Sequence, residues 1–471
     1  MNRLKQLLKT PFARQSAILQ GSGLTVAALQ LFSTVAIANL IGDVEQGTYF
    51  IAVAIYGLLF MLMNTGVVQA TVVQLASGMA AADTDQVAAW QAFLVKLYLI
   101  GGFLLLGVGW FALPLGADVV LHDREAGELA LYLMVLPFLE LPRVVAQATF
   151  QAVRRMHDLA KLELFTEIGR VALVVGLAYS MGDARGPVIG TALAGLVGSV
   201  AGVTLYRKAA QSGEHKLPSI GKILSRVRDV PIRRGLWLGV RVGSLRSIDA
   251  ITVQVMPPLI IAAAGGLAGR NEAAIKAAVA HFRIAQRVVQ IPLMLLQGIS
   301  RTTLPALSQM AGRKDAEGFR KAWMRVTAVS GAICVSGMLA VVLARPLLPW
   351  LLGLVGLPES YHEPVSNNIP ILAIGAAIVG FSTASEAFYV VADRLRVAML
   401  IAGIMMWPSM GLTYLFSYHL PATGAAWGVA FTYSVAAMHV AYAFFYFRSG
   451  RHSSLFQSEP DPAADPSPEP A

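Results

Sequence analysis

The chain contains apolar stretches that are too long for the core of an ordinary water-soluble domain. Six stretches of about 20 residues or more, the length that a helix needs to cross a bilayer, contain almost no Asp, Glu, Lys or Arg: residues 15–42, 46–82, 97–118, 326–344, 397–418 and 420–447. Charged residues make up only 14% of the chain, against about 25% in a typical soluble domain. The sequence therefore predicts an all-α, polytopic membrane protein.

Twelve transmembrane helices are expected. They lie near residues 16–40, 47–77, 90–113, 127–150, 160–181, 187–206, 235–264, 274–308, 323–345, 366–391, 396–417 and 421–447. The loop cations gather in the N-terminal leader and near residues 154–161, 207–234, 313–325, 394–396 and 448–451, whereas the opposite side receives Arg124, Arg185, Arg270 and Arg345. Because cytoplasmic loops carry the excess of Lys and Arg, we expect both termini in the cytoplasm. The net charge of +10 then implies no nucleic-acid partner.

The two halves of the chain resemble each other. Thr71-Val-Val-Gln-Leu-Ala-Ser ends the second predicted helix, and Thr303-Leu-Pro-Ala-Leu-Ser ends the eighth. Phe150-Gln-Ala-Val-Arg-Arg ends the fourth, and Phe388-Tyr-Val-Val-Ala-Asp-Arg ends the tenth. This shared order predicts two six-helix lobes with the same orientation in the membrane. We expect an N-terminal lobe at residues 1–206, a basic cytoplasmic linker at 207–234, a C-terminal lobe at 235–447 and a disordered cytoplasmic tail at 448–471.

Enzyme chemistry is not indicated by any motif in the chain. The sequence contains no Walker A loop, no G-x-S-x-G, no H-E-x-x-H and no Cys/His metal spacing. The single cysteine, Cys334, lies in an apolar run and rules out an intrachain disulfide. We therefore expect no catalytic activity, no metal and no cofactor.

Charges inside the predicted helices are the most informative polar residues, because burying an ion in a membrane is costly. In the eighth helix, polar and cationic residues recur at steps of three and four: Arg283, Arg287, Gln290, Met294, Gln297 and Arg301. On a helix they form one stripe of about 27 Å at 1.5 Å per residue. The stripe indicates a helix that lines a wet passage. The alternative is that Arg283 and Arg301 extend to the two membrane interfaces.

The seventh predicted helix carries a second group of charges, Arg241, Arg246 and Asp249. Arg246 and Asp249 are three residues apart, so one interpretation is a structural ion pair. The other is a cavity cation next to an acid that changes protonation during transport. Glu386, in the tenth helix, is a second candidate for ion coupling. Pro257-Pro258 removes two backbone donors and is expected to kink the seventh helix.

The first half contains polar residues with two possible roles. The amide side chains of the first two helices either line the same cavity or join neighbouring helices; they are Gln20, Gln30, Asn39, Asn64, Gln69 and Gln74. Glu140 and Arg143 are three residues apart in the fourth helix and are expected to form a structural pair.

Several segments resemble a known family. Ala38-Asn-Leu-Ile-Gly-Asp-Val-Glu-Gln-Gly-Thr-Tyr is similar to its first periplasmic turn, and Asn64-Thr-Gly-Val to a polar-Gly step in its second helix. Gln290-Ile-Pro-Leu and Pro305-Ala-Leu-Ser resemble its eighth helix. Phe150-Gln-Ala and Gly424-Ala-Ala-Trp-Gly-Val-Ala resemble its fourth and twelfth. Over about residues 10–450 the chain looks like a polysaccharide transporter, an O-antigen or exopolysaccharide flippase of the multidrug/oligosaccharidyl-lipid/polysaccharide exporter superfamily.

The resemblance implies two lobes around a central cavity and alternating access. It implies transfer of an undecaprenyl-pyrophosphate-linked oligosaccharide from the cytoplasmic to the periplasmic leaflet of a bacterial inner membrane. Membrane lipids, and a polymerase and chain-length regulator of the same pathway, are the implied partners. Arginine forks bind phosphate oxygens in pairs. We therefore predict that the substrate is held by Arg241, Arg246, Arg283, Arg287, Gln290, Gln297 and Arg301, with ion coupling through Asp249 or Glu386.

Three other functions remain open from the sequence. A drug or cation antiporter of the same superfamily would present carboxylates and aromatic residues to its cargo rather than an arginine stripe. A peptidoglycan-precursor flippase commonly has two more membrane helices than the twelve expected here. A membrane-bound glycosyltransferase or polymerase would need a large loop with acidic or catalytic residues, but the long loop at 207–234 is basic.

Overall fold

The computed structural model describes residues 11–64, 66–213, 216–230, 232–233, 235–237, 239, 248–312, 315–392 and 394–450. In the first half, the helices are α2 (Pro11–Asn64), α3 (Val67–Ala80), α4 (Thr84–Leu121), α5 (Arg124–Leu133), α6 (Leu136–Ala152), α7 (Met156–Met181), α8 (Arg185–Gln211) and α9 (Ile220–Arg226). The predicted 451–471 part of the tail lies outside the described residues, as does the leader before residue 11.

The regular elements of the second half are also all helices in its described residues. It comprises the π-helical turn η1 (Ile251–Val255), α11 (Met256–Leu267), α12 (Glu272–Gly312), α13 (Ala316–Leu343), the 3₁₀ turn η2 (Arg345–Leu347), α14 (Leu348–Leu354), α15 (Glu359–Ser382), α16 (Ser385–Val391), α17 (Leu395–His419) and α18 (Gly424–Arg448). The helix continues through Pro257-Pro258, and η1 precedes them. The wider π turn supplies the local adjustment that the missing donors require.

The twelve expected membrane helices are present in the described part of the chain. Nine helices are long and apolar enough to span a membrane, and the pair α5 and α6, bent by 44°, makes a tenth. Helix α2 provides two spans, because the chain turns back at Gly42, whose φ of 77° favours glycine over residues with a side chain. These two spans of α2 raise the count to eleven. The charged helix α12, which is 41 residues long and is the eighth along the chain, completes the twelve. The all-α, twelve-helix fold is thus confirmed.

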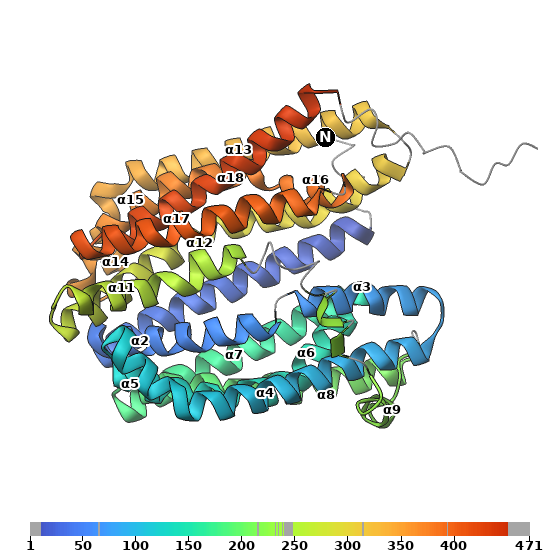
Figure 1. The fold of residues 1–471 in the computed structure, drawn as a ribbon, viewed down its shortest axis with the longest axis horizontal. Coiled ribbons are helices and arrows are strands. Elements are labelled where there is room, and N and C mark those ends of the chain that lie inside the picture. The colour runs from blue at the N-terminus through green and yellow to red at the C-terminus, as the bar shows by residue number, and fades with distance from the viewer. Residues whose placement is uncertain are drawn as a thin grey trace, which may run out of the picture.

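The helices form two bundles that lie one above the other in Figure 1. Helices α2 to α8 pack together in the lower bundle, and α12, α13, α15, α17 and α18 pack together in the upper one. The bundles meet along α2 and α12. Each bundle is one lobe, so the predicted two-lobe layout matches the observed one.

Among the described residues, the two lobes share a hydrophobic core at one end, which we call the outer end. There, Ile37 and Phe50 of α2 belong to the same buried cluster as Phe282 of α12 and Tyr361 of α15. At the other, inner end each described lobe has its own cluster. Phe93 and its neighbours fill the N-terminal one, whereas the C-terminal one includes Trp323, Phe388 and Phe447. The described parts of the lobes therefore share one core at the outer end and have separate cores at the inner end.

A glycine permits the close contact of the lobes at the outer end. A Cβ atom on Gly47 of α2 would lie 2.0 Å from the backbone oxygen of Lys276 in α12. This backbone cannot yield locally without moving one helix away from the other. We expect Gly47→Ala to weaken outer closure by about 1–3 kcal/mol, the usual cost of overpacking.

Electron-resonance distances between spin labels would measure this change. Labels at Arg124→Cys and Arg345→Cys, in a Cys334→Ser background, report on the outer ends of the two lobes. The distance distribution should broaden and lengthen in Gly47→Ala. The matched control is Gly57→Ala on the same limb of α2, where the added Cβ would lie 3.4 Å from the Val255 side chain, an ordinary contact. Equal distributions for both variants would contradict the prediction.

Candidate functional site

A polar cavity of about 650 Å³ lies in the C-terminal lobe. The cavity is lined by four segments from separate parts of the chain: the described part of the seventh membrane helix, α12, α15 and α18. The lining residues are Asp249, Ala250, Val253, Gln254, Arg287, Gln290, Leu293, Met294, Val379, Ser382, Thr432, Tyr433, Val435, Ala436 and His439. The cavity thus combines one guanidinium, one carboxylate and several neutral hydrogen-bonding groups.

The helical register of α12 explains why its polar side chains reach this cavity. Arg287, Gln290 and Met294 recur at steps of three and four and line the cavity together. Ile284 and Val289, on other faces of the same turns, are buried in the core shared by the lobes. One helix therefore presents an apolar surface to the core and a polar surface to the cavity.

Arg287 lies where the cavity meets the opposite lobe. Its Nη1 atom donates a hydrogen bond of 2.8 Å to Oε1 of Gln30 in α2. An arginine has five N–H donors in a planar fork, and this amide accepts from one of them. The Gln30 contact therefore orients the guanidinium at the boundary between the lobes.

Arg283, one turn earlier, occupies a different environment. Its Nη1 donates to the backbone oxygen of Gln254 at 2.9 Å and to Oε1 of Gln286 at 2.7 Å. Its guanidinium carbon also lies 5.6 Å from the centre of the Phe50 ring, in a cation–π contact across the lobes. Arg283 thus does not extend to a membrane interface, and it is not among the residues that line the cavity.

The other predicted site residues fall into two groups. Gln290 and Asp249 line the cavity. Arg241 and Arg246 lie outside the described residues, as do the side chains of Gln297, Arg301 and Glu386, although the helices α12 and α16 include their backbones. The expected pair of Glu140 and Arg143 is present at 2.9 Å.

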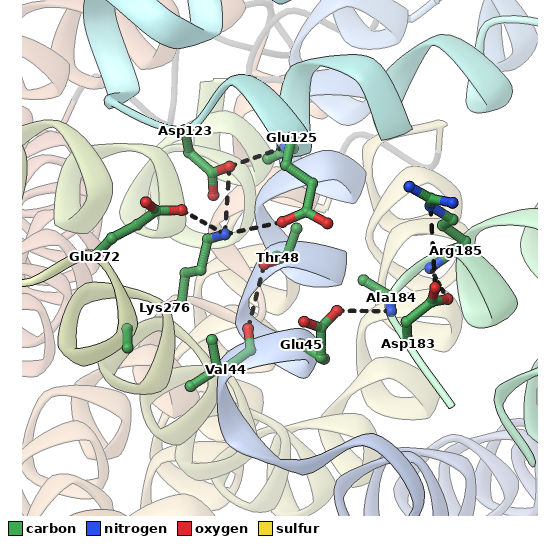
Figure 2. Close-up of polar contacts among 12 residues, drawn as sticks. Val44, Glu45, Thr48, Asp123, Glu125, Asp183, Ala184, Arg185, Glu272 and Lys276 are labelled. Atoms are coloured by element: carbon green, nitrogen blue, oxygen red, sulfur yellow. Dashed lines mark hydrogen bonds and ion pairs between the residues drawn. The ribbon is translucent and has the colours of Figure 1, made fainter. Parts of the chain in front are cut away.

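A buried lysine joins the lobes at the outer end, beyond the cavity (Figure 2). Nζ of Lys276 in α12 lies 3.6 Å from Asp123, 3.1 Å from Glu125 and 2.7 Å from Glu272. Asp123 and Glu125 belong to the N-terminal lobe, and Glu272 belongs to α12 itself. The Lys276 side chain is only 6% exposed, so this ion cluster replaces most of the water around its ammonium group.

Asp123 is held in place by its role at the start of α5. Its carboxylate accepts a hydrogen bond of 2.9 Å from the backbone N–H of Ala126 and caps the helix. Burial raises the pKa of Asp123 above its ordinary value, while the Ala126 hydrogen bond and then the Lys276 charge oppose that rise. The charge balance of this site therefore depends on the lysine from the other lobe.

Further polar contacts cross the outer end. The Tyr361 hydroxyl donates to Oε1 of Gln46 at 2.9 Å, and the Asn39 amide donates to the Gly356 oxygen at 2.6 Å. His281 lies 3.5 Å from Asp43. Together with the shared core, these contacts hold the outer end closed.

Sequence reasoning did not identify Lys276 or its partners. A signal was available, because Lys276 precedes Arg283 by seven residues and so extends the polar stripe of α12 by two turns. The residues that meet it from the other lobe, Asp123 and Glu125, precede it by more than 150 positions in the sequence. They lie in a loop and in the helix after it, so spacing alone does not reveal them.

Comparison with known families gives two matches. The family model described as polysaccharide biosynthesis protein matches residues 12–311, which is more than half of the chain. The MatE family model matches residues 258–415. No curated protein sequence matches the chain.

Solved structures of similar fold are transporters. A multidrug resistance MATE family transporter of the MOP superfamily, in an inward-facing conformation, has a TM-score of 0.60 at 18% identity, with 94% of this chain and 96% of that chain covered. A MOP superfamily transporter from Pyrococcus furiosus has a TM-score of 0.64 at 15% identity, with coverages of 96% and 98%. A eukaryotic MATE transporter has a TM-score of 0.63 at 15% identity, with coverages of 95% and 98%.

At these identities the structural similarity establishes the fold, and the family match establishes the relationship. Both agree with the helical membrane fold described above. The chain therefore belongs to the polysaccharide biosynthesis protein family, and its fold is that of the multi-pass MOP superfamily transporters compared above.

Proposed function

We propose that the protein translocates an undecaprenyl-pyrophosphate-linked oligosaccharide, an O-antigen or exopolysaccharide repeat unit, from the cytoplasmic to the periplasmic leaflet of a bacterial inner membrane. The observation that carries this proposal is the position of Arg287. Its guanidinium lines the cavity of the C-terminal lobe and lies at the boundary with the other lobe, where it bonds to Gln30. The match to the polysaccharide biosynthesis family supports the same substrate class.

The chemistry of the cargo fits this site. A pyrophosphate presents several anionic oxygens, and an arginine fork pairs with two of them at once while keeping its charge at any relevant pH. In a partly dehydrated cavity these charge-assisted hydrogen bonds are stronger than in water. Gln290, on the next turn of α12, adds an amide donor to the same wall. The lipid tail remains in the bilayer while the head group crosses between the lobes.

The arrangement of the lobes supports loading from the cytoplasm. Basic loops predict that the inner end faces the cytoplasm, and the lobes have separate cores at that end. The outer end, sealed by Lys276 and the shared core, would then face the periplasm. Transport requires the outer contacts to break and the inner ends to approach, which is alternating access. The polymerase and chain-length regulator of the pathway would act on the cargo after its release.

A cation antiporter is the second candidate, and two observations favour it. The MatE model matches residues 258–415, and the cavity also contains Asp249, Tyr433 and His439, a carboxylate and rings that suit a cationic ligand. The Pyrococcus furiosus transporter is described as having a binding pocket of reverse polarity, which suggests a different function for it. The sign of charge in the cavity is therefore the property that separates the two candidates.

Reconstitution would distinguish them. Purified protein in proteoliposomes would be supplied with undecaprenyl-pyrophosphate-linked N-acetylglucosamine in one experiment and with a fluorescent lipophilic cation in another. We expect protein-dependent transfer of the lipid-linked sugar between leaflets and no cation movement beyond that of empty liposomes. Cation movement without lipid transfer would overturn the proposal and favour the antiporter.

A further inference from the structure

A second cavity, of about 350 Å³, lies in the N-terminal lobe. It is within the range of roughly 300–1,000 Å³ that is typical of small-molecule sites. Its polar walls come from α2, α3, α4 and α6, and its polar lining residues are Asn64, Gln69, Tyr98, Glu140, Arg143 and Gln147. None of these residues belongs to the arginine-lined cavity of the other lobe.

Several polar atoms at this cavity are buried without a hydrogen-bond partner among the described residues. They are the Tyr98 hydroxyl, Oδ1 of Asn64 and Nε of Arg143. Tyr98 is only 1% exposed. Its hydroxyl and the Asn64 amide are near enough to interact, but the contact lacks the geometry of a hydrogen bond. Because buried polar groups in proteins are nearly always bonded, unsatisfied donors and acceptors that line one cavity indicate a site for a polar ligand.

The charges of this cavity balance each other. Nη2 of Arg143 lies 2.9 Å from Oε2 of Glu140, and Nη1 donates to Oε1 of Gln147 at 3.3 Å. The paired charges offer little attraction to a free anion or cation, whereas amides, a phenol and a fixed ion pair supply both donors and acceptors. The Phe60 ring packs edge-on against Tyr98, with 5.9 Å between ring centres, and adds an apolar wall. Such a mixture suits a neutral ligand rich in hydroxyl groups.

The position of the cavity relates it to the arginine site. Ala250, in the seventh membrane helix, lines both cavities. A lipid-linked oligosaccharide carries its first sugar directly on the pyrophosphate. Its two chemical parts, anionic and neutral, would therefore fit two adjacent cavities of matching character.

We propose that the N-terminal cavity is a subsite for a neutral sugar residue of the cargo, with Tyr98, Asn64 and Gln147 as its hydrogen-bonding groups. This inference rests on the proposed function, since it assumes that the pyrophosphate lies at Arg287. It assigns glycan recognition to the N-terminal lobe and head-group recognition to the C-terminal lobe. Cargo that contacts both lobes would then couple substrate identity to their movement.

The test compares lipids with and without a sugar. Binding of undecaprenyl pyrophosphate, and of the same lipid carrying N-acetylglucosamine or galactose, would be measured with purified full-length protein. In Tyr98→Phe, which removes one hydroxyl and keeps the ring, we expect affinity for at least one sugar-bearing lipid to fall about tenfold, the effect of about 1.4 kcal/mol. Affinity for the sugar-free lipid should not change. The matched control is Tyr206→Phe, because the Tyr206 hydroxyl is buried in the same lobe but bonds to Gln91 and the Pro218 oxygen.

The possible outcomes separate the subsite from the proposed function. A protein that binds none of the three lipids would refute both. If the lipids bind but neither sugar increases affinity, or if Tyr98→Phe affects all three lipids equally, the subsite is wrong while the proposed function stands. A loss confined to a sugar-bearing lipid, absent in Tyr206→Phe, would support the subsite.

Discussion

Replacing Arg287 with alanine should reduce the initial rate of lipid-linked oligosaccharide transfer by about 10- to 100-fold. The reason is that a hydrogen bond to a charged group contributes about 1.5–3 kcal/mol. A net loss equivalent to one such bond to the pyrophosphate corresponds to roughly this range, because about 1.4 kcal/mol is a factor of ten. Arg287→Lys keeps the charge but not the planar fork, so its rate should lie between those of wild type and Arg287→Ala. Arg287→Glu should transfer least, because it repels the cargo. Transfer by proteoliposomes, at equal protein content, is the measurement.

Two control variants would test whether the effect belongs to the cavity. Arg320→Ala removes an arginine at the start of α13, where it pairs with Glu317 away from both cavities, and should leave transfer unchanged. Gln30→Leu removes the amide that orients Arg287 and should give a smaller loss than Arg287→Ala. If folded Arg287→Ala protein transfers the lipid at the wild-type rate, the assignment of Arg287 to the head group is wrong.

Replacing Lys276 with methionine should open the outer end. Methionine is similar in length, but the substitution leaves Asp123 buried without the opposing cation. Removing one partner of a buried ion cluster typically costs about 3–5 kcal/mol, and here only the closed form bears that cost. The spin-label pair at positions 124 and 345 should report longer distances in Lys276→Met. Lys321→Met is the control, because that lysine is 68% exposed at the inner end and, among the described residues, pairs with Glu317 alone.

Acidification and a second substitution should each restore closure in this variant. Loss of the lysine raises the pKa of Asp123 further than burial already does. A carboxyl with a raised pKa in the closed form binds protons more readily there, so closure should recover as the pH falls from that raised value toward about 4, the ordinary pKa of Asp. Asp123→Asn in the Lys276→Met background should restore closure at neutral pH. Unchanged label distances in Lys276→Met would show that the shared core alone closes the outer end.

The membrane fold could be predicted from local properties of the chain. A membrane helix is specified by about 20 consecutive apolar residues, so its existence is readable without knowledge of its neighbours. This held for the helices at 90–113 and 323–345, which correspond to α4 and α13. The spacing of Glu140 and Arg143 also identified their ion pair, since residues three apart on a helix share a face.

The candidate site could be predicted from the sequence only in part. The stripe on α12 predicted a polar face, but helical spacing gave no reason to assign Arg283 and Arg287 to different environments. In the structure Arg287 lines the cavity, whereas Arg283 bonds to the backbone of the seventh helix and contacts Phe50. One turn of helix separates them, and the difference arises from which neighbouring helix lies beside each turn.

The amino-acid sequence by itself determined the number of membrane helices and the polar face of α12, because hydrophobic length and helical periodicity act over one segment at a time. Only the tertiary structure decided that Lys276 meets Asp123 and Glu125, that Gln30 holds Arg287, and that two cavities with different polar linings adjoin Ala250. These features depend on how two lobes are placed against each other. That placement results from many small packing terms distributed over the whole interface, and no short segment of sequence encodes it.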